Sequence, residues 1–333
     1  MEDEKILRSP ASPIASVASL VFSCLFWGIS FPLMQMVADD LARASGWVER
    51  SIVQDFALRV TFTGWRFAAA TVLYGLLTLR RQRGYRAHEV RGGIIVGVFF
   101  TAGLFLQMGG LRYALPSVSA VLTSMVVVFT PLAQYFWLRR PISTILWQSV
   151  ILALVGMLIL ALPNPSAAAR LTLTDVPPLP WLGEAFTLIA SLLFTAQVLA
   201  VDHFGKAADV TRFTLVMFAV SAVASLVLGL LLGGAPLYTP SALTSILHDA
   251  RFLAATGGIV GISSVGAFHL MNSAQPKVSP AVASVIYCTE PVFATMWSVI
   301  FGTEAITFIT LAGGGLVILA MVRLARLQSP TSS

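Results

Sequence analysis

The chain has 333 residues, of which 57% are hydrophobic and only 11% are charged, and its mean hydropathy is +0.84. A soluble domain carries about 25% charged residues, so this composition excludes a soluble globular protein and indicates a polytopic membrane protein. The formal net charge of +6 does not point to a nucleic-acid partner. The basic residues stand in short segments between apolar runs, where they orient a chain in the membrane.

Ten apolar runs come close to the roughly 20 residues that a helix needs to cross a bilayer. They lie near residues 14–36, 60–79, 92–113, 116–138, 145–162, 181–203, 213–233, 252–274, 278–301 and 305–323. The sequence therefore predicts an all-α polytopic membrane protein with ten transmembrane helices.

Lys and Arg residues flank the predicted spans unevenly. If the N-terminus lies inside the cell, the inside segments carry 14 of these residues and the outside segments carry 6. Because basic residues concentrate in cytoplasmic loops, both termini are expected in the cytoplasm, with the bacterial inner membrane as the location. The densest basic segment, RRQRGYRAHEVR (80–91), is interpreted as one of these topology signals.

A weak internal repeat is visible, because residues 111–138 match residues 271–298 at an offset of 160. Identical pairs include Ala114/Ala274, Pro116/Pro276, Val118/Val278, Ser119/Ser279, Ser124/Ser284, Pro131/Pro291 and Trp137/Trp297. Five spans per copy is an odd number, so the second copy would enter the membrane upside down. Inverted repeats around a midplane site are typical of secondary transporters. The expected units are a first five-helix repeat at 1–165, a linker at 166–180 and a second five-helix repeat at 181–333.

Three stretches, FWGISFPL (26–33), RFAAATVL (66–73) and EPVFATMWSVIFGTE (290–304), resemble the EamA-type transporters of the drug/metabolite transporter superfamily. The resemblance covers nearly the whole chain in two copies. It implies a ten-helix fold and transport of small metabolites such as amino acids, nucleosides or drugs. The first copy departs from the family pattern, because Thr130-Pro131 replaces Glu-Pro and Arg139-Arg140 stands where Gly-Glu is expected. Any role of Glu290 therefore belongs to one half only.

The pair Glu290-Pro291 stands in the middle of an apolar run. An acid inside a membrane span is costly and is functional by default, and a mid-helix proline bends its helix. Pro131 and Pro291 are therefore predicted to act as equivalent hinges of an alternating-access transporter. The alternative for Glu290 is structural, as a protonated acid that caps the carbonyl groups freed by Pro291.

Polar and aromatic residues on the same helix faces suggest a small-molecule cavity, since aromatic walls with a few polar groups are usual there. A lone carboxylate with Tyr and Trp also suits a cationic ligand. The expected substrate-binding residues are Glu290, Tyr287, Trp297, Gln134, Trp137, Trp27, Ser30, Gln107, Gln197 and His269. For the glutamines and His269, an interhelical hydrogen bond is the favoured alternative. Arg66 is expected to reach outward to the interface or to form a structural pair rather than to bind substrate.

Glycines spaced four residues apart are expected to allow close packing of helices within the chain. They are Gly93/Gly97, Gly229/Gly233 and Gly257/Gly261.

Taken together, these features predict a secondary transporter that moves a small organic molecule by alternating access around a midplane site. The expected partners are this substrate, a proton exchanged at Glu290 and the lipid bilayer, with the chain a monomer or homodimer and no nucleic acid bound. No catalytic residue, metal ligand or cofactor is expected, because HExxH, GxSxG and P-loop patterns do not occur. The alternative is a polytopic membrane enzyme acting on a lipid or isoprenoid, which would need clustered acids, His or Arg at a membrane surface.

Overall fold

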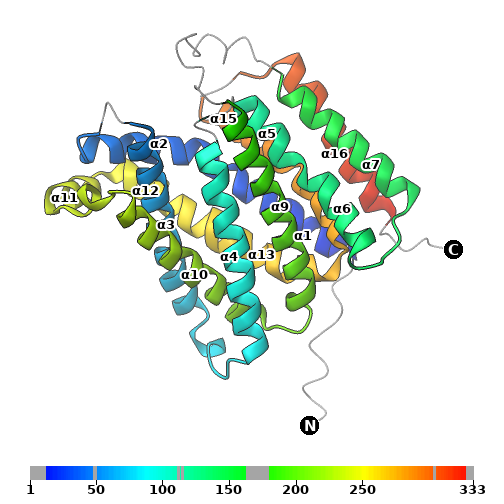
Figure 1. Cartoon of the computed structure of the whole chain (residues 1–333), viewed down its shortest axis with the longest axis horizontal. Helices are drawn as coiled ribbons and strands as arrows, with labels where there is room; N and C mark the ends of the chain where they lie inside the picture. Colours follow the sequence, from blue (N-terminus) through cyan, green and yellow to red (C-terminus); the bar gives the residue numbers. More distant parts are fainter. Residues whose placement is uncertain are drawn as a thin grey trace.

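The computed structural model describes residues 13–47, 51–110, 113, 116–162, 180–302 and 305–327. These residues form helices joined by short turns, and no strand occurs among them (Figure 1). Glu304 and residues 166–179 of the predicted linker lie outside the described residues.

The α-helices of the first half are α1 (Pro13–Gly28), α2 (Ser30–Ala44), α3 (Ile52–Leu77), α4 (Ala87–Gly110), α5 (Pro116–Ser124), α6 (Val126–Phe136) and α7 (Thr144–Leu160). Those of the second half are α9 (Pro180–Gly205), α10 (Val210–Leu231), α11 (Pro240–Leu247), α12 (Ala250–Gly258), α13 (Ala267–Ala274), α14 (Pro280–Tyr287), α15 (Glu290–Ile300) and α16 (Phe308–Leu327). A π-helical segment, η4 (Ile259–Gly266), joins α12 to α13.

Eight helical segments of the described chain are long and apolar enough to cross a membrane. They are Ile14–Ala44, Ala87–Gly110, Ser119–Phe136, Trp181–Gly205, Val210–Leu231, Ala250–Lys277, Pro280–Ile300 and Phe308–Ala325. The remaining two predicted spans correspond to α3, which has 26 residues but contains Asp55, Arg59 and Arg66, and to α7, which is apolar but has only 17 residues. Length and composition thus support eight of the ten predicted spans.

Two predicted span ends are wrong for identifiable reasons. The first span was expected to end near residue 36, but α2 continues to Ala44 because its charged end satisfies itself, with Arg43 paired to Asp40. The second span was expected to begin near residue 60, but α3 begins at Ile52. Ser51 and Gln54 form a capping box that satisfies the free N–H groups at this end, with hydrogen bonds of 3.3 and 2.8 Å.

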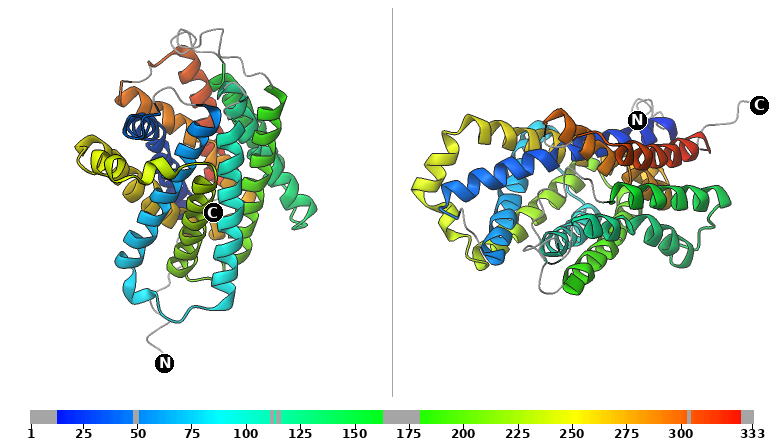
Figure 2. Two further views of the ribbon diagram at one scale, coloured as in Figure 1. Left: turned by 60° about the vertical axis from the view of Figure 1, so that its left-hand side comes forward. Right: turned by 90° about the horizontal axis from the view of Figure 1, so that it is seen from above.

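Helices of the first half pack chiefly against helices of the second half. α3 runs along α10, α4 along α9, and α7 along α16, the last pair forming one edge of the bundle (Figures 1 and 2). The contact of α3 with α10 joins the second spans of the two halves, and the contact of α7 with α16 joins the fifth spans. Both contacts therefore stay the same when the two halves are exchanged. The contact of α9 with α4 joins the first span of the second half to the third span of the first half. The corresponding pair with the halves exchanged is α1 with α13, and these helices are also in contact.

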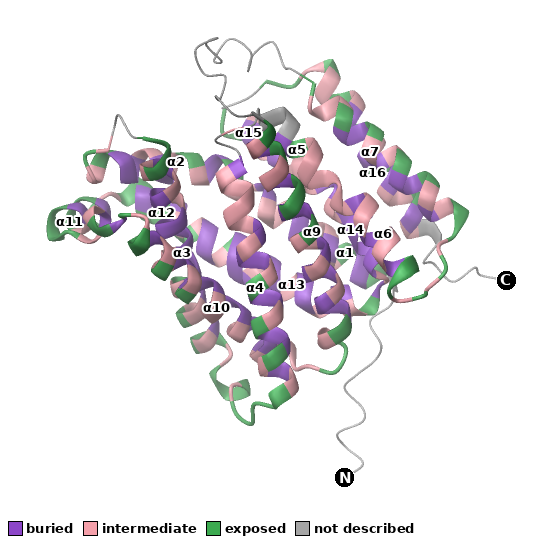
Figure 3. Ribbon diagram, viewed as in Figure 1, coloured by how far each residue is buried: buried purple, intermediate pink, exposed green. Residues whose placement is uncertain are grey.

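Buried residues concentrate where helices adjoin one another, and exposed residues are frequent along the outer helices and at the turns (Figure 3). The exposed side chains include large apolar ones such as Leu76, Ile151 and Leu231. Apolar surface of this extent is expected of helices in contact with lipid.

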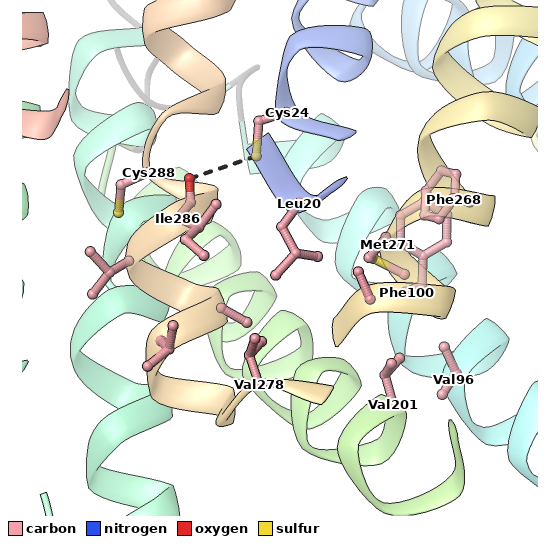
Figure 4. Packing of buried hydrophobic residues seen from close by; sticks show 14 of the residues in the cluster. Leu20, Cys24, Val96, Phe100, Val201, Phe268, Met271, Val278, Ile286 and Cys288 are labelled. Carbon is pink, nitrogen blue, oxygen red and sulfur yellow. Dashed lines mark hydrogen bonds between the residues drawn. The ribbon is translucent and has the colours of Figure 1, made fainter. Parts of the chain in front are cut away.

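Inside the bundle, a large apolar cluster joins the two halves. In Figure 4, Cys24 of α1 and Ile286 of α14 face each other within it, and the Cys24 thiol donates a hydrogen bond to the Ile286 carbonyl at 3.6 Å. The same view shows Leu20, Phe100, Phe268 and Met271 in this cluster.

The three glycine pairs differ in whether they allow a neighbouring helix to approach closely. A Cβ on Gly93 would lie 2.7 Å from a Val216 side-chain atom, and one on Gly97 would lie 3.0 Å from Val220, so this pair allows α4 to approach α10 as predicted. Gly229 likewise approaches Thr61, but Gly233 ends a helix with a φ of +89°. The prediction is wrong for Gly257 and Gly261, because no atom lies within 4 Å of a Cβ added at either.

Candidate functional site

The ninth predicted span is interrupted where Glu290 stands. α14 ends at Tyr287 and α15 begins at Glu290, with Cys288 and Thr289 between them. Pro291 has no backbone N–H and cannot donate to the Tyr287 carbonyl one turn earlier. The partly buried Glu290 therefore begins a helix, where the partial positive charge of the N-terminus favours a carboxylate.

The turn before Glu290 is fixed by its own hydrogen bonds. The Thr289 hydroxyl and backbone N–H donate to the Ile286 carbonyl at 2.7 and 2.9 Å. Thr289 is buried, so this local bond also satisfies a hydroxyl that is shielded from solvent.

The matching span of the first half is also interrupted, but at a different position. α5 ends at Ser124 and α6 begins at Val126, so the break falls at Met125, and Pro131 stands inside α6. Pro291, by contrast, stands in the first turn of α15, directly after its break. The two prolines therefore do not mark equivalent interruptions, and their action as hinges stays a prediction.

Gln134 joins the interrupted spans of the two halves. Its side chain is buried, and its Oε1 accepts a hydrogen bond from the backbone N–H of Ala281 at 3.1 Å. Ala281 is in the first turn of α14, where N–H groups have no partner within the helix. Gln134 thus caps α14 from the neighbouring α6.

Arg66 lies inside the bundle, and the expectation that it reaches outward to the interface is wrong. Its side chain is buried, its Nε donates to the Ser264 hydroxyl at 2.7 Å, and its Nη2 donates to the Ser263 hydroxyl at 3.1 Å. Its guanidinium carbon is 5.2 Å from the centre of the Phe67 ring. A planar fork of donors suits two hydroxyl groups that stand side by side.

The π-helical segment η4 explains why two adjacent serines reach the same side chain. Ser264 donates to the carbonyl of Ile259, five residues earlier, at 3.0 Å. A π turn inserts one extra residue and rotates the following side chains, and such turns occur frequently at functional sites. The bulge therefore presents both hydroxyls to Arg66.

Glu290 and the buried Arg66 are opposite charges inside the same helix bundle. The structure describes both residues and gives no direct hydrogen bond between their side chains. Opposite charges inside a membrane protein reduce each other's cost of burial. We call these two opposite charges a charge pair, although no hydrogen bond or ion pair joins their side chains in the described part of the chain.

An aromatic wall lies beside this pair. The Trp27 ring meets the Phe268 ring at a centroid distance of 5.2 Å and the Tyr287 ring at 5.7 Å. The Tyr287 hydroxyl donates to Oε1 of the buried Gln275 at 2.7 Å, and the Gln275 amide in turn donates to the Val198 carbonyl. Tyr287 and Trp27, both expected at the site, are therefore brought together.

The indole nitrogen of Trp27 is buried and has no hydrogen-bond partner among the described residues. A buried donor without a partner costs free energy. This N–H is therefore a donor that the described side chains and backbone leave unsatisfied.

Two more expected residues fix the end of α1. The Trp297 indole N–H donates to the Leu25 carbonyl at 2.9 Å, and the Ser30 hydroxyl donates to the Trp27 carbonyl at 2.7 Å. The first span breaks at Ile29, between α1 and α2. Because the last carbonyls of a helix lack partners within it, these two side chains satisfy them.

The remaining expected residues make other contacts. His269 Nδ1 shares a hydrogen bond of 2.6 Å with the Tyr74 hydroxyl, and the Gln197 amide is 3.9 Å from the Met271 sulfur. The Gln107 amide donates to the Thr123 hydroxyl at 3.3 Å. Each of these contacts joins two helices, in line with the alternative of an interhelical hydrogen bond for the glutamines and His269.

Trp137 is not brought to the site. It follows the last residue of α6 and is 81% exposed. The internal repeat aligns Trp137 with Trp297, but the two side chains have different environments, since Trp297 is half-buried against α1.

Sequence reasoning missed several residues that shape the site: Ser263, Ser264, Gln275 and Thr289. The adjacent serines of an otherwise apolar run could have been noticed, but their target depends on the π bulge. Among the described residues, no group of three or more His, Cys, Asp or Glu side chains could hold a metal ion.

Ionic contacts join the two halves at the end of the bundle that carries the 80–91 segment. Glu89 of α4 is buried and accepts hydrogen bonds from Arg212 Nε at 2.7 Å and Arg212 Nη2 at 2.8 Å. It also accepts backbone N–H bonds from Arg86 and Asp209, both at 3.0 Å. At the same end, Arg140 and Lys206 contact the buried Asp202 at 3.2 and 2.7 Å.

Asp209 caps α10 beside this network. Burial raises the pKa of its carboxyl, but hydrogen bonds from the Thr211 hydroxyl and from the backbone N–H groups of Thr211 and Arg212, together with the Arg212 charge, hold the pKa below its ordinary value. The group is therefore ionised and stabilises the start of α10.

These features define a multi-pass helical membrane protein of two related halves, with charged and aromatic side chains gathered between them. The sequence model of the EamA-like transporter family matches residues 14–162 and again residues 181–325. The chain belongs to this family, and the membership indicates a transporter of the drug/metabolite type.

Among solved structures, 29 chains match this protein. One, titled "Crystal structure of protein", has 15% sequence identity and a TM-score of 0.66, and the alignment covers 95% of this chain and 99% of that chain. At this identity the likeness establishes the fold alone. The search of curated proteins found no significant match.

Proposed function

We propose that this protein is a secondary transporter that carries a small organic molecule across the membrane by alternating access around Glu290. The observation that carries the proposal is the placement of Glu290 at the start of α15, at a helix break inside the same bundle that holds the buried Arg66. A charged pair inside a membrane bundle is expensive, and it persists where it binds or moves something. No contact among the described residues favours the alternative of a lipid-modifying enzyme.

The chemistry of the site favours a ligand with both polar and apolar parts. Glu290 offers a negative group, the Trp27 indole offers an unused donor, and the rings of Tyr287 and Phe268 offer apolar surface. Glu290 would accept either a proton or a cationic group of the ligand. Exchange between the two gives a route to proton-coupled transport.

The ionic contacts at the 80–91 end support alternating access. Glu89 with Arg212, and Arg140 with Asp202, each join a residue of the first half to one of the second. The ion pairs Asp40–Arg43 and Asp55–Arg59 lie within single helices instead. These inter-half pairs would hold the 80–91 end closed in one state of the transport cycle, and this end would open when they separate. Pro131 and Pro291 remain our proposed bending points.

The arrangement in the membrane follows from the same proposal. Ten spans, with α3 and α7 included, would place the two halves in opposite orientations, and the exchangeable helix contacts support such an inverted repeat. Both termini would then face the cytoplasm of a bacterial cell, across the inner membrane. The transporting unit would be a monomer or a homodimer.

Ligand binding tests the proposal before transport can be assayed. The purified protein is heated with each member of a panel of metabolites, since a ligand that binds only the folded state raises its Tm. We expect at least one amino-bearing compound to raise the Tm of the wild type and to have a much smaller effect on Glu290→Gln. The matched control is Glu184→Gln, because Glu184 is an exposed acid of α9.

Uptake into proteoliposomes then separates binding from transport. Glu290→Gln is expected to insert and fold but to lose pH-dependent transport of the compound found above, whereas Glu184→Gln keeps it. If Glu290 is only a structural cap, Glu290→Gln transports normally and only Glu290→Leu lowers the yield and Tm. That outcome would refute the proposed site.

A further inference from the structure

A surface cavity lies outside the site described above, at the end of the bundle that carries the basic segment 80–91. It has a volume of about 590 Å³ and is lined by Tyr85, Arg86, Val90, Arg91, Ile94 and Ile95, along with Ala87. A second hollow of about 390 Å³ borders the same turn of α4 and shares Ala87 and Arg91 with it. Neither hollow is used by the proposed transport mechanism.

The cations of this cavity are not neutralised within the part of the chain that the structure describes. Arg86 and Arg91 are exposed, and no ion pair is formed by either of them there. The nearby acid Glu89 is buried and occupied by Arg212. The two guanidinium groups are therefore free to bind an anion.

The floor of the cavity is apolar and continues into the membrane-spanning part of α4. Ile94 is 43% exposed, and Val98, one turn further along the helix, is 50% exposed. Arg91, Ile94 and Val98 are spaced three and four residues apart, so they lie on one face of α4. Arg91 thus stands directly above an apolar stripe, and Arg86 lines the same cavity.

We propose that this cavity binds one anionic phospholipid of the adjoining leaflet. The phosphate would contact Arg86 and Arg91, and one acyl chain would follow Ile94 and Val98 along α4. Basic pockets at the cytoplasmic ends of membrane helices bind anionic headgroups. The combination of free cations with an apolar stripe distinguishes a lipid from a soluble phosphate, which would have no use for the stripe.

Native mass spectrometry of the purified full chain tests the proposal with phosphatidylglycerol as the probe. Phosphatidylethanolamine with the same acyl chains, and glycerol 3-phosphate, are the comparison ligands. We expect the wild type to bind phosphatidylglycerol roughly tenfold or more tightly than phosphatidylethanolamine, and to bind glycerol 3-phosphate weakly. Replacing both arginines, in Arg86→Gln/Arg91→Gln, should weaken phosphatidylglycerol binding by about thirtyfold, given the usual contribution of basic residues near an anionic membrane surface.

A matched control separates a built site from general basic charge. Arg80→Gln/Arg83→Gln removes the same charge from the same segment but leaves the cavity lining intact. This control should change phosphatidylglycerol binding by less than about threefold. An equal loss in both double variants, equal binding of the two lipids, or glycerol 3-phosphate binding as tightly as phosphatidylglycerol would each overturn the proposal.

Discussion

The side-chain Oε1 of Gln134 accepts a hydrogen bond from the backbone N–H of Ala281 at 3.1 Å, and this bond ties α6 of the first half to α14 of the second. Both helices belong to the interrupted spans that the internal repeat relates. The bond supplies a partner to a helix-start N–H that would otherwise be buried without one. The glutamine thus stabilises the start of the broken span that leads to Glu290.

Gln134→Leu is expected to lower the stability by about 1–2 kcal/mol, because it leaves the buried Ala281 N–H without an acceptor. The Tm of the purified protein measures this. Gln35→Leu is the control, since Gln35 is exposed and hydrogen-bonds Asp39 on its own helix. Equal Tm values for the two variants would contradict a capping role for Gln134.

The close contact between α7 and α16 gives a second prediction. A Cβ on Gly313 would lie 2.7 Å from the Gly156 carbonyl oxygen, and one on Gly156 would lie equally close to the Gly313 oxygen. Gly313→Val is therefore expected to destabilise the protein by about 1–3 kcal/mol through overpacking. Gly315→Val should have little effect, since no atom lies within 4 Å of a Cβ there. A similar loss of Tm in both variants would show that helix propensity, not packing, is responsible.

The ionic network at the 80–91 end predicts how the conformation responds to loss of charge. Glu89→Gln leaves Arg212 unchanged but removes the carboxylate that accepts hydrogen bonds from its Nε and Nη2. Breaking a buried pair in this way costs about 3–5 kcal/mol, so the closed arrangement of this end should become less populated. Spin labels at exposed Ala87 and Ala207 measure the separation of the halves. An unchanged distance distribution, with unchanged Tm, would rule out the network as a latch.

The depressed pKa of Asp209 predicts a dependence of stability on pH. A carboxyl with a lowered folded-state pKa stabilises the protein fully above its unfolded value of about 3.9, and this stabilisation is lost as the pH falls through the lower folded value. Asp209→Asn keeps a capping side chain but removes the charge. The wild type should therefore have the higher Tm at neutral pH, and the difference should shrink below about pH 4. A difference that stays constant in acid would contradict this assignment.

Much of the architecture could be predicted because hydrophobic runs report membrane spans directly. The same composition could not reveal that α2 extends to Ala44, since the burial of Val37, Ala38 and Leu41 against α11 and α12 depends on three-dimensional contacts. The family resemblance directed attention to Glu290 and Pro291, but not to the break at Ile29 or to the π bulge at 259–266. Both depend on how neighbouring helices pack. The offset of 160 treated Trp137 as equivalent to Trp297, although only the tertiary structure determines that one is exposed and the other packs against α1.

The charge pair of Arg66 and Glu290 gives the last prediction, which is best tested as a double-mutant cycle. Arg66→Gln leaves Glu290 without its nearby cation, and it also removes the fork that binds Ser263 and Ser264. It should therefore lower the Tm and the yield strongly. Arg66→Gln/Glu290→Gln removes both charges, so it should be at least as stable as Arg66→Gln alone. The coupling between the two changes should be on the order of 0.5–3 kcal/mol, the range for residues that share one network. Loss of transport in both Gln variants, with stability recovered only in the double variant, would indicate that the pair is retained for function at a cost in stability. Strictly additive Tm changes would instead show that Arg66 serves only the serines of the π bulge and that Glu290 is balanced by another group.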